Sequence, residues 1–320
     1  MTLSPATGPY LAQILENSYP IWNDGLTPSA YARYWDAQIR TPWGAAHLDR
    51  VALVDGDTVV SSLKRYDLNA RLDGRIRRVL GLGAVFTSPA HRGRGAAREL
   101  LQRVLATAVT EGYELAALFS EIAPAFYERL DFVPVPLHEI RIAVRPSRGS
   151  PAVLVRAGDQ RDLPAIAEMS ARRSATTRLA LERSEELIRF GLTKRRLLAG
   201  LGPPGLRQVE FLVVEEGYTA VAYVIGSEQD GKWFIEEAGD RDPAGARVGA
   251  MMQAMLSRLP AESPPEIRAW WPHDFIPPQV EVAERYPTNG VLMIRALTDG
   301  ILAVPPLRAE DVAYWRLDYF

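Results

Sequence analysis

The 320-residue chain contains no cysteine, and this absence removes several kinds of chemistry. It excludes disulfide bonds, metal sites with thiolate ligands, and a catalytic cysteine that holds an acyl group. Neither sign of charge dominates, because 37 Lys and Arg residues nearly balance 39 Asp and Glu residues, for a net charge of −2. The composition therefore favours no nucleic-acid partner and no electrostatic attachment to a membrane.

Long apolar runs are also missing. No stretch approaches the ~18 apolar residues that a membrane-spanning helix needs. The first ten residues lack a basic start followed by an apolar core, so no signal peptide is predicted. We therefore expect a cytoplasmic protein with no membrane partner, and the sequence carries no signal for the oligomeric state.

What is present is a globular composition, 47% hydrophobic, in a chain long enough for about two domains. Strands are predicted at Val51–Val54 and Thr58–Leu63, on either side of the turn signal Asp55-Gly56-Asp57. A longer strand is predicted from Arg77 to Thr87. A glycine-containing loop, a helix and a further strand then follow, in the order of a βαβ unit.

A linker is predicted at residues 145–151, which include two prolines, one glycine and two serines. It divides the chain into a first domain, residues 1–147, and a second, residues 151–320. The strand order partly repeats after the linker, with strands predicted at Val209–Val214, Ala220–Ile225 and Trp233–Glu237.

The loop after the strand ending at Thr87, called the glycine loop below, has the features of a phosphate-binding helix start. Its glycines let the backbone approach a ligand, its alanines leave the first helical turn unobstructed, and its arginines add positive charge. A dinucleotide-binding loop would need glycine where Arg98 stands, and the only Gly-Lys pair, Gly231-Lys232, precedes Trp233 and forms no P-loop. The glycine loop consists of Arg92, Gly93, Arg94, Gly95, Ala96 and Ala97.

This loop matches the pattern Q/R-x-x-G-x-G/A and resembles the GNAT (N-acetyltransferase) superfamily. The resemblance implies an α/β fold with a mixed, mostly antiparallel twisted sheet flanked by helices, here as two tandem GNAT-like domains. It implies acetyl-CoA as acyl donor and no metal. The loop would bind the pyrophosphate, and the strand residues Val85, Phe86 and Thr87 would bind the pantetheine arm, through the backbone of the first and last.

A second family signature lies at residues 124–132, which resemble F-Y-x-x-x-G-F with Asp131 in place of the glycine. Aspartate tolerates the left-handed conformation better than most residues, so we expect the helix to end there as in the family. By the same resemblance, Tyr127 would protonate the departing CoA thiolate. The alternatives are a packed core tyrosine and, for the loop, a solvated basic turn or an RNA contact.

The base that deprotonates the amine has several candidates. Glu121 is the first, and His138 and Glu139 are further ones. In Eis-type acetyltransferases, which also pair two GNAT-like domains, the terminal carboxylate reaches the active site, which gives Phe320 as another candidate. Full activity after deletion of the last residue would contradict that role.

The acceptor is expected to be a small-molecule primary amine, which attacks the thioester directly because no cysteine is present. Predicted acceptor-binding residues are Trp22, Tyr34, Ser120 and Phe320. Residues 118–127 also resemble fungal lysine acetyltransferases, so free lysine is one candidate beside aminoglycosides and polyamines. A non-catalytic acyl-CoA sensor and a protein lysine acetyltransferase are the rival functions.

The second domain is expected to be degenerate. Its counterpart of the glycine loop contains Asp240 and Asp242, which would repel a pyrophosphate.

Overall fold

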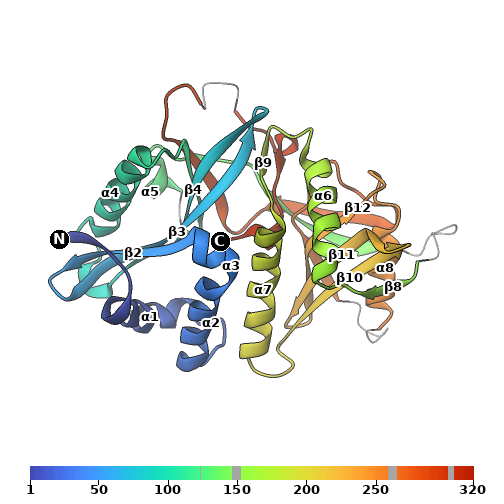
Figure 1. Cartoon of the computed structure of the whole chain (residues 1–320), viewed down its shortest axis with the longest axis horizontal. Helices are drawn as coiled ribbons and strands as arrows, with labels where there is room; N and C mark the ends of the chain where they lie inside the picture. Colours follow the sequence, from blue (N-terminus) through green and yellow to red (C-terminus); the bar gives the residue numbers. More distant parts are fainter. Residues whose placement is uncertain (123, 146–152, 259–264, 302–305) are drawn as a thin grey trace. The chain divides into compact units, whose positions relative to one another are not determined.

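The computed structural model describes residues 1–122, 124–145, 153–258, 265–301 and 306–320. They form two compact units, each with a mixed sheet flanked by helices, and the predicted fold class is confirmed (Figure 1). The first unit comprises Met1–Val135, Asn289–Leu307 and Phe320. The second comprises Pro136–Thr288 and Arg308–Tyr319.

The first sheet has the strand order β1-β2-β3-β4-β5-β15-β6. Its neighbours pair antiparallel except β4 and β5, which pair parallel. The elements of this unit are β1 (Thr2–Pro5), α1 (Gly8–Trp22), α2 (Pro28–Arg40), α3 (Pro42–His47), β2 (Leu48–Asp55), β3 (Thr58–Leu72), β4 (Arg75–Thr87), η1 (Pro89–His91), α4 (Ala96–Thr110), β5 (Leu115–Ser120), α5 (Ala125–Glu128), β6 (Val133–Pro134) and β15 (Val291–Ala296).

Helices cover both faces of the first sheet, as the strands between α4 and α1 in Figure 1 show. Successive side chains of a strand point to opposite faces. Leu53 and Leu63 accordingly pack in the core with α4, whereas Ala52 packs with Ile14 of α1. We call these the α4 face and the α1 face.

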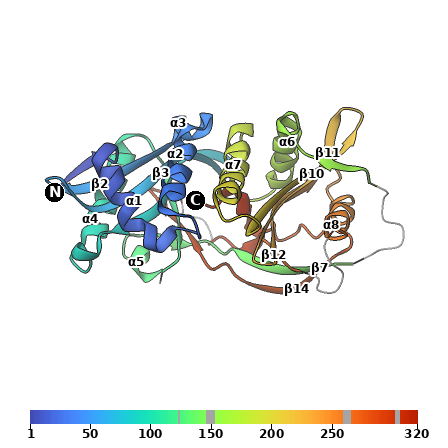
Figure 2. The same cartoon turned by 90° about the horizontal axis from the view of Figure 1, so that it is seen from below.

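The second sheet has the order β14-β7-β13-β12-β11-β10-β8, again with one parallel pair, β12 with β13. Helices α6 and α7 lie on one side of β10, β11 and β12 (Figure 2). The elements are β7 (His138–Val144), β8 (Val155–Ala157), η2 (Gln160–Asp162), α6 (Leu163–Ser174), β9 (Leu179–Leu181), α7 (Glu185–Leu201), β10 (Arg207–Glu216), β11 (Thr219–Gln229), β12 (Lys232–Asp240), α8 (Val248–Leu256), β13 (Glu266–Ala269), β14 (Val280–Pro287), η3 (Ala309–Asp311), β16 (Val312–Ala313) and η4 (Arg316–Asp318).

The division between the units differs from the predicted boundary between residues 147 and 151. Strand β7 pairs with β13 and β14, and its Ile140 and Ile142 are buried in the core of the second unit. Strand β15, from late in the chain, pairs with β5 in the first sheet. Strand β7 thus belongs to the second unit, because its apolar side chains are buried in that core. The proline-rich segment lies between β7 and β8, which belong to the same unit. Residues 146–152 of the predicted linker lie outside the described residues.

Candidate active site

The glycine loop joins η1 to α4 in an open conformation. Gly93 (φ +74°) and Gly95 (φ +81°) both adopt left-handed backbone, and Gly95 is the N-cap of α4. Other residues rarely adopt these angles, so the loop conformation itself requires glycine at both positions. A β-carbon at either would meet no atom within 4 Å, which leaves the backbone accessible to a ligand.

The backbone N–H groups of residues 93–98 form a cradle of unused donors. Within the part of the chain that the structure describes, none of these six donates a hydrogen bond, and the next N–H along, that of Glu99, donates to Gly95 at 3.0 Å. The first N–H groups of a helix point out of its end and add to the positive pole of its dipole. The side chains of Arg92 and Arg94 are exposed around the cradle. These residues therefore fit a diphosphate.

Strands β4 and β5 separate beside this loop. Their parallel pairing extends from Val79 with Leu115 to Leu82 with Leu118, although β4 continues to Thr87. Beyond Leu82, the edge of β4 that faced β5 has no ladder partner in the described pairings. An extended chain such as a pantetheine arm can pair with such an edge.

A β-bulge interrupts the pairing of β4 with β3 at the separation. Ser62 pairs with Phe86 and Lys64 with Gly83, so β4 contains one residue more than β3 in this stretch. Ala84 lies in the left-handed region, with φ +47°. The bulge shifts the alternation, so that Val85 packs on the α4 face. The sequence does not predict this bulge, because alanine carries no signal for a positive φ.

The predicted pantetheine-binding residues follow the bulge. Phe86 is buried and packs edge-on against Trp22 of α1, with ring centroids 6.1 Å apart. The carbonyl of Thr87 accepts a hydrogen bond from Nε of Arg92 at 3.2 Å. That bond ties the end of β4 to the glycine loop.

Tyr127 lies in α5 on the α4 face and is 6% exposed. Burial raises the pKa of its phenol to about 12, and the negative charge of Glu121 adds to the rise. The phenol is thus a proton donor that stays protonated far above neutral pH. Asp131 after this helix has φ +60°, which confirms the predicted left-handed helix end.

The end of β5 holds two further predicted residues. Ser120 is buried, and its hydroxyl donates to the carbonyl of Ile122 at 2.8 Å, so it stabilises the turn after the strand. Glu121 is exposed, and its negative charge contributes to the raised pKa of Tyr127.

Aromatic side chains gather on the α1 face of the sheet. The ring of Phe320 packs against Tyr66 of β3 (5.0 Å between centroids) and edge-on against Phe119 of β5 (5.6 Å). Gly81 and Gly83 of β4 make room for it, because a β-carbon there would lie 3.1 Å and 3.2 Å from atoms of Phe320.

Helix α2 contributes Tyr34, whose ring lies edge-on to the ring of Trp35 with centroids 5.7 Å apart. The buried ammonium of Lys64 also lies over the ring of Trp35. Tyr66 and Lys64 belong to no motif that would mark them in the sequence. Both stand on β3, whose alternation places them on the α1 face.

Two further base candidates belong to the second unit. His138 and Glu139 belong to β7 in the second unit. The carboxylate of Glu139 accepts hydrogen bonds from Arg268 (3.0 Å) and Trp270 (2.9 Å), so both of its oxygens have partners within the second unit.

A family model described as "Acetyltransferase (GNAT) domain" matches residues 11–135. Residues 11–135 belong to the GNAT acetyltransferase family. The matched range covers the glycine loop, the strand separation and Tyr127. GNAT acetyltransferases use acetyl-CoA as donor and act on an acceptor substrate. A comparison with curated proteins finds no similar sequence.

Solved structures of GNAT proteins resemble the whole chain in fold. A GCN5-related N-acetyltransferase from Kribbella flavida is 18% identical, with a TM-score of 0.68, covering 92% of this chain and 70% of that one. Eis1 from Mycobacterium abscessus is 18% identical, with a TM-score of 0.53 and coverage of 85% and 71%. A tandem GNAT protein from the clavulanic acid biosynthesis pathway is 13% identical, with a TM-score of 0.55 and coverage of 93% and 99%. At these identities the likeness shows the fold alone.

The second unit, unlike the GNAT domain, has a carboxylate at the corresponding helix start. Asp240 at the end of β12 accepts hydrogen bonds from the backbone N–H groups of Asp242 (2.9 Å) and Arg247 (2.8 Å). A β-carbon on Gly249 in α8 would lie 2.2 Å from the carbonyl oxygen of Pro278, so neighbouring backbone covers this helix start. The carboxylate of Asp240 thus supplies the negative charge at the start of α8.

Among the described residues, no three His, Asp or Glu side chains are grouped as metal ligands would be. No helix in the described ranges has both the length and the apolar character that crossing a membrane requires.

Proposed function

We propose that this protein transfers an acetyl group from acetyl-CoA to the primary amine of a small molecule, by direct attack of the amine on the thioester. The observation that supports this most is the combination of three features in the GNAT domain. These are the unused N–H donors of residues 93–98, the separation of β4 from β5 after Leu82, and the buried phenol of Tyr127.

The glycine loop and the end of β4 would hold the donor. The N–H groups of residues 93–98 would bind the pyrophosphate, with Arg92 and Arg94 adding charge-assisted contacts. The free edge of β4 at Val85 and Thr87 would pair with the amides of the pantetheine arm. The side chain of Phe86 packs against α1 and would fix this edge in place.

Tyr127 would act as the general acid. Its phenol is buried and protonated, and it would donate its proton to the sulfur of the leaving thiolate. The chain has no cysteine for an acyl-enzyme intermediate, which supports transfer in one step.

Glu121 would act as the general base, directly or through a water chain. An amine of pKa about 10 needs roughly 4 kcal/mol to lose its proton at pH 7, so a nearby carboxylate has a clear function. Glu121 is exposed at the end of β5, where the acceptor would meet the separated strands.

The aromatic residues Trp22, Tyr34 and Phe320 would bind the acceptor. Aromatic faces attract ammonium groups and cover the apolar part of a small amine. Phe320 lies at the strand separation, with its backbone beside Gly83 of β4 and its ring edge-on against Phe119 of β5. Ser120 would act indirectly, through the turn that its hydroxyl stabilises.

The second unit would bind no donor, because Asp240 already uses the N–H groups that a pyrophosphate needs. A single CoA site per chain is therefore expected.

The test is calorimetric titration with acetyl-CoA, followed by a CoA-release assay over a panel of lysine, polyamines, aminoglycosides and lysine-containing peptides. We expect one acetyl-CoA per chain, and release of CoA that depends on a small amine. Tight binding without release for any amine would favour an acyl-CoA sensor, and release with peptides alone would favour a protein acetyltransferase.

A further inference from the structure

The end of the chain belongs to the second unit up to Tyr319, whereas the last residue, Phe320, belongs to the first unit. We call residues 315–319 the tail anchor. Two of its side chains are buried in apolar cores of the second unit, Trp315 in the core that contains α8 and Leu317 in the core that contains α6 and α7. The tail anchor is therefore packed as part of the second unit.

Arg316 of the tail anchor reaches a buried carboxylate of β12. Its guanidinium donates a hydrogen bond to Glu236, which is fully buried, and lies over the ring of Phe234, 4.0 Å from the centroid. Glu236 also accepts a hydrogen bond from Ser227 at 2.5 Å and pairs with Arg195 of α7 at 2.9 Å. Arg195 in turn donates to the carbonyl of Arg316 at 3.0 Å. Both β12 and α7 thus hold the tail anchor at this residue.

Asp318 and Tyr319 are also held by groups of the second unit. The carboxylate of Asp318 forms an ion pair with the buried guanidinium of Arg183, at 2.9 Å from Nε to Oδ2. The same guanidinium donates to both oxygens of Glu237 at 2.5 Å. The carbonyl of Tyr319 accepts a hydrogen bond from Nζ of Lys194 at 2.7 Å. The contacts therefore continue to the last residue of the tail anchor.

These contacts allow the tail anchor only one register. Buried ion pairs add little net stability, because the cost of removing both charges from water offsets much of their attraction, but a buried charge that loses its partner is strongly unfavourable. A slip by one residue would separate Arg316 and Asp318 from their partners. Gly191 of α7 adds a steric limit, since a β-carbon there would lie 2.8 Å from Cγ of Leu317. The position of Tyr319 on the second unit is therefore fixed.

The residue that follows the tail anchor is part of the aromatic surface on the α1 face. The ring of Phe320 packs against Tyr66 and Phe119, and its backbone lies beside Gly83. Chain ends are mobile unless the structure ties them down. The register of the tail anchor thus limits where Phe320 can lie.

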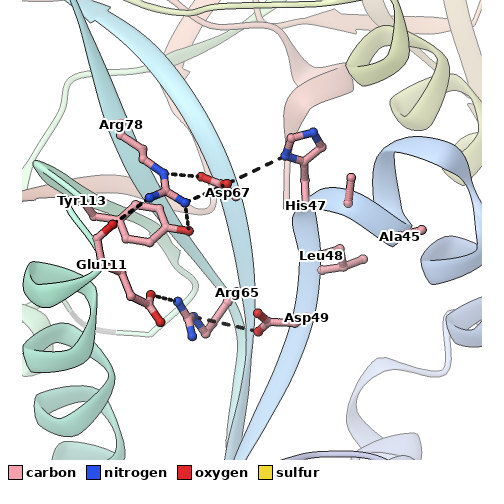
Figure 3. Close-up of a pocket in the computed structure, with 10 residues that line it drawn as sticks. Ala45, His47, Leu48, Asp49, Arg65, Asp67, Arg78, Glu111 and Tyr113 are labelled. Carbon is pink, nitrogen blue, oxygen red and sulfur yellow. Dashed lines mark hydrogen bonds and ion pairs between the residues drawn. The ribbon is translucent and has the colours of Figure 1, made fainter.

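A pocket of about 480 Å³ on the first unit, between α3 and the end of α4, is lined by other residues (Figure 3). The guanidinium of Arg78 donates two hydrogen bonds of 3.0 Å to Asp67, and that of Arg65 pairs with Glu111. Because these arginines already have carboxylate partners within the pocket, we keep the acceptor on the aromatic surface that includes Phe320.

We propose that the second unit positions Phe320 for acceptor binding, with Glu236 and Arg183 as positioning residues that act through the tail anchor. This inference rests on the proposed function, in which Phe320 binds the acceptor. It gives the second unit a role in the reaction although Asp240 occupies its helix start.

The first experiment measures how firmly Phe320 is held and does not depend on catalysis. Carboxypeptidase A removes a C-terminal aromatic residue once the chain end opens, so the rate of Phe320 release, followed by mass spectrometry, reports local opening. Arg316→Gln removes the contact with β12, and Lys194→Met removes the contact with the carbonyl of Tyr319. We expect each variant to release Phe320 about tenfold faster than the parent protein. Arg316→Lys keeps the positive charge and should restore most of the protection.

Arg308→Gln is the matched control, because its side chain precedes the tail anchor and is 71% exposed. It should release Phe320 at the parent rate. Equal rates in the parent protein, Arg316→Gln and Lys194→Met would overturn the proposal, as would equally fast release from Arg308→Gln.

The second experiment measures the consequence for the acceptor. Arg316→Gln should raise the KM for the acceptor amine about fivefold or more and leave the Kd for acetyl-CoA unchanged, because the glycine loop lies in the first unit. Added to Phe320→Ala, Arg316→Gln should have no further effect, since the tail anchor acts only through Phe320. Effects on KM that multiply in the double variant would overturn the proposal. A parent protein that acetylates no amine would refute the proposed function, and the release rates would still decide whether the tail anchor positions Phe320.

Discussion

Leu82 of β4 and Leu118 of β5 are the last residues at which these two parallel strands pair. The next residues, Gly83 and Phe119, lie on the α1 face, where the backbone of Phe320 is beside Gly83 and its ring packs edge-on against Phe119. Tyr127 belongs to the core on the α4 face. In the proposed mechanism, the proton donor Tyr127 therefore lies on the α4 face of the strand separation and the aromatic surface for the acceptor on its α1 face.

The glycine loop can be tested by adding a carboxylate to the start of α4. Ala97→Glu should raise the Kd for acetyl-CoA about tenfold or more, because the new charge repels the pyrophosphate. The same charge is favourable at a helix N-terminus, so the melting temperature should not fall. Ala106→Glu, exposed on the same helix away from the loop, is the control and should bind acetyl-CoA as the parent does. Equal affinities in the two variants would remove the loop from the donor site.

Tyr127→Phe should lower kcat about 100-fold and leave the Kd for acetyl-CoA nearly unchanged, because only the proton donor is lost. The pKa of Tyr127 is raised to about 12 in the folded protein. Activity should therefore not decline through loss of this proton until the pH is far above 10. Above pH 10 the phenol of the unfolded chain ionises while that of the folded chain does not, so stability should fall as pH rises from about 10 to 12. Stopped-flow rates and urea unfolding between about pH 10 and 12 measure the two effects. An unchanged kcat in Tyr127→Phe would exclude Tyr127 as the acid.

Glu121→Gln should lower kcat/KM about 100-fold at pH 7 and recover as pH approaches the pKa of the amine, because free amine then needs no base. Glu128→Gln, exposed on α5, is the matched control and should retain the parent profile. Parallel pH profiles for Glu121→Gln and the parent protein would assign deprotonation to another group.

The second unit contains a buried amine whose titration should be visible in stability. Nζ of Lys194 donates to the carbonyl of Tyr319 at 2.7 Å, and burial lowers the pKa of this amine to about 7, with Arg195 adding to the effect. Between pH 7 and 10 the unfolded chain binds a proton here that the folded chain does not, so stability falls as pH decreases through this range.

Lys194→Met removes that dependence. From pH 7 to about 9, the free energy of unfolding of the parent protein should rise about 2 kcal/mol more than that of the variant. Urea unfolding at the two pH values measures this, and parallel changes in both proteins would contradict a neutral buried amine.

Local chemistry made much of the GNAT domain predictable. Gly93 and Gly95 stand where left-handed backbone is needed, and Asp131 ends its helix as expected. The first two predicted strands lie within β2 and β3.

Long-range pairing was not predictable in the same way. Strand β15, which begins at Val291, pairs in the first sheet, and β7 pairs in the second sheet. The sequence of neither strand indicates which strand it pairs with. The bulge at Ala84 arises from a register difference between two strands and has no local signal.

The most direct test of the proposed function is to quantify CoA and acetylated amine together by mass spectrometry, with acetyl-CoA and the best amine of the panel. We expect the two products in equal amounts, formed about 100-fold more slowly by Tyr127→Phe at unchanged acetyl-CoA affinity. Acetyl-CoA bound at one site per chain with no acetylated amine formed, or an undiminished rate in Tyr127→Phe, would contradict the account.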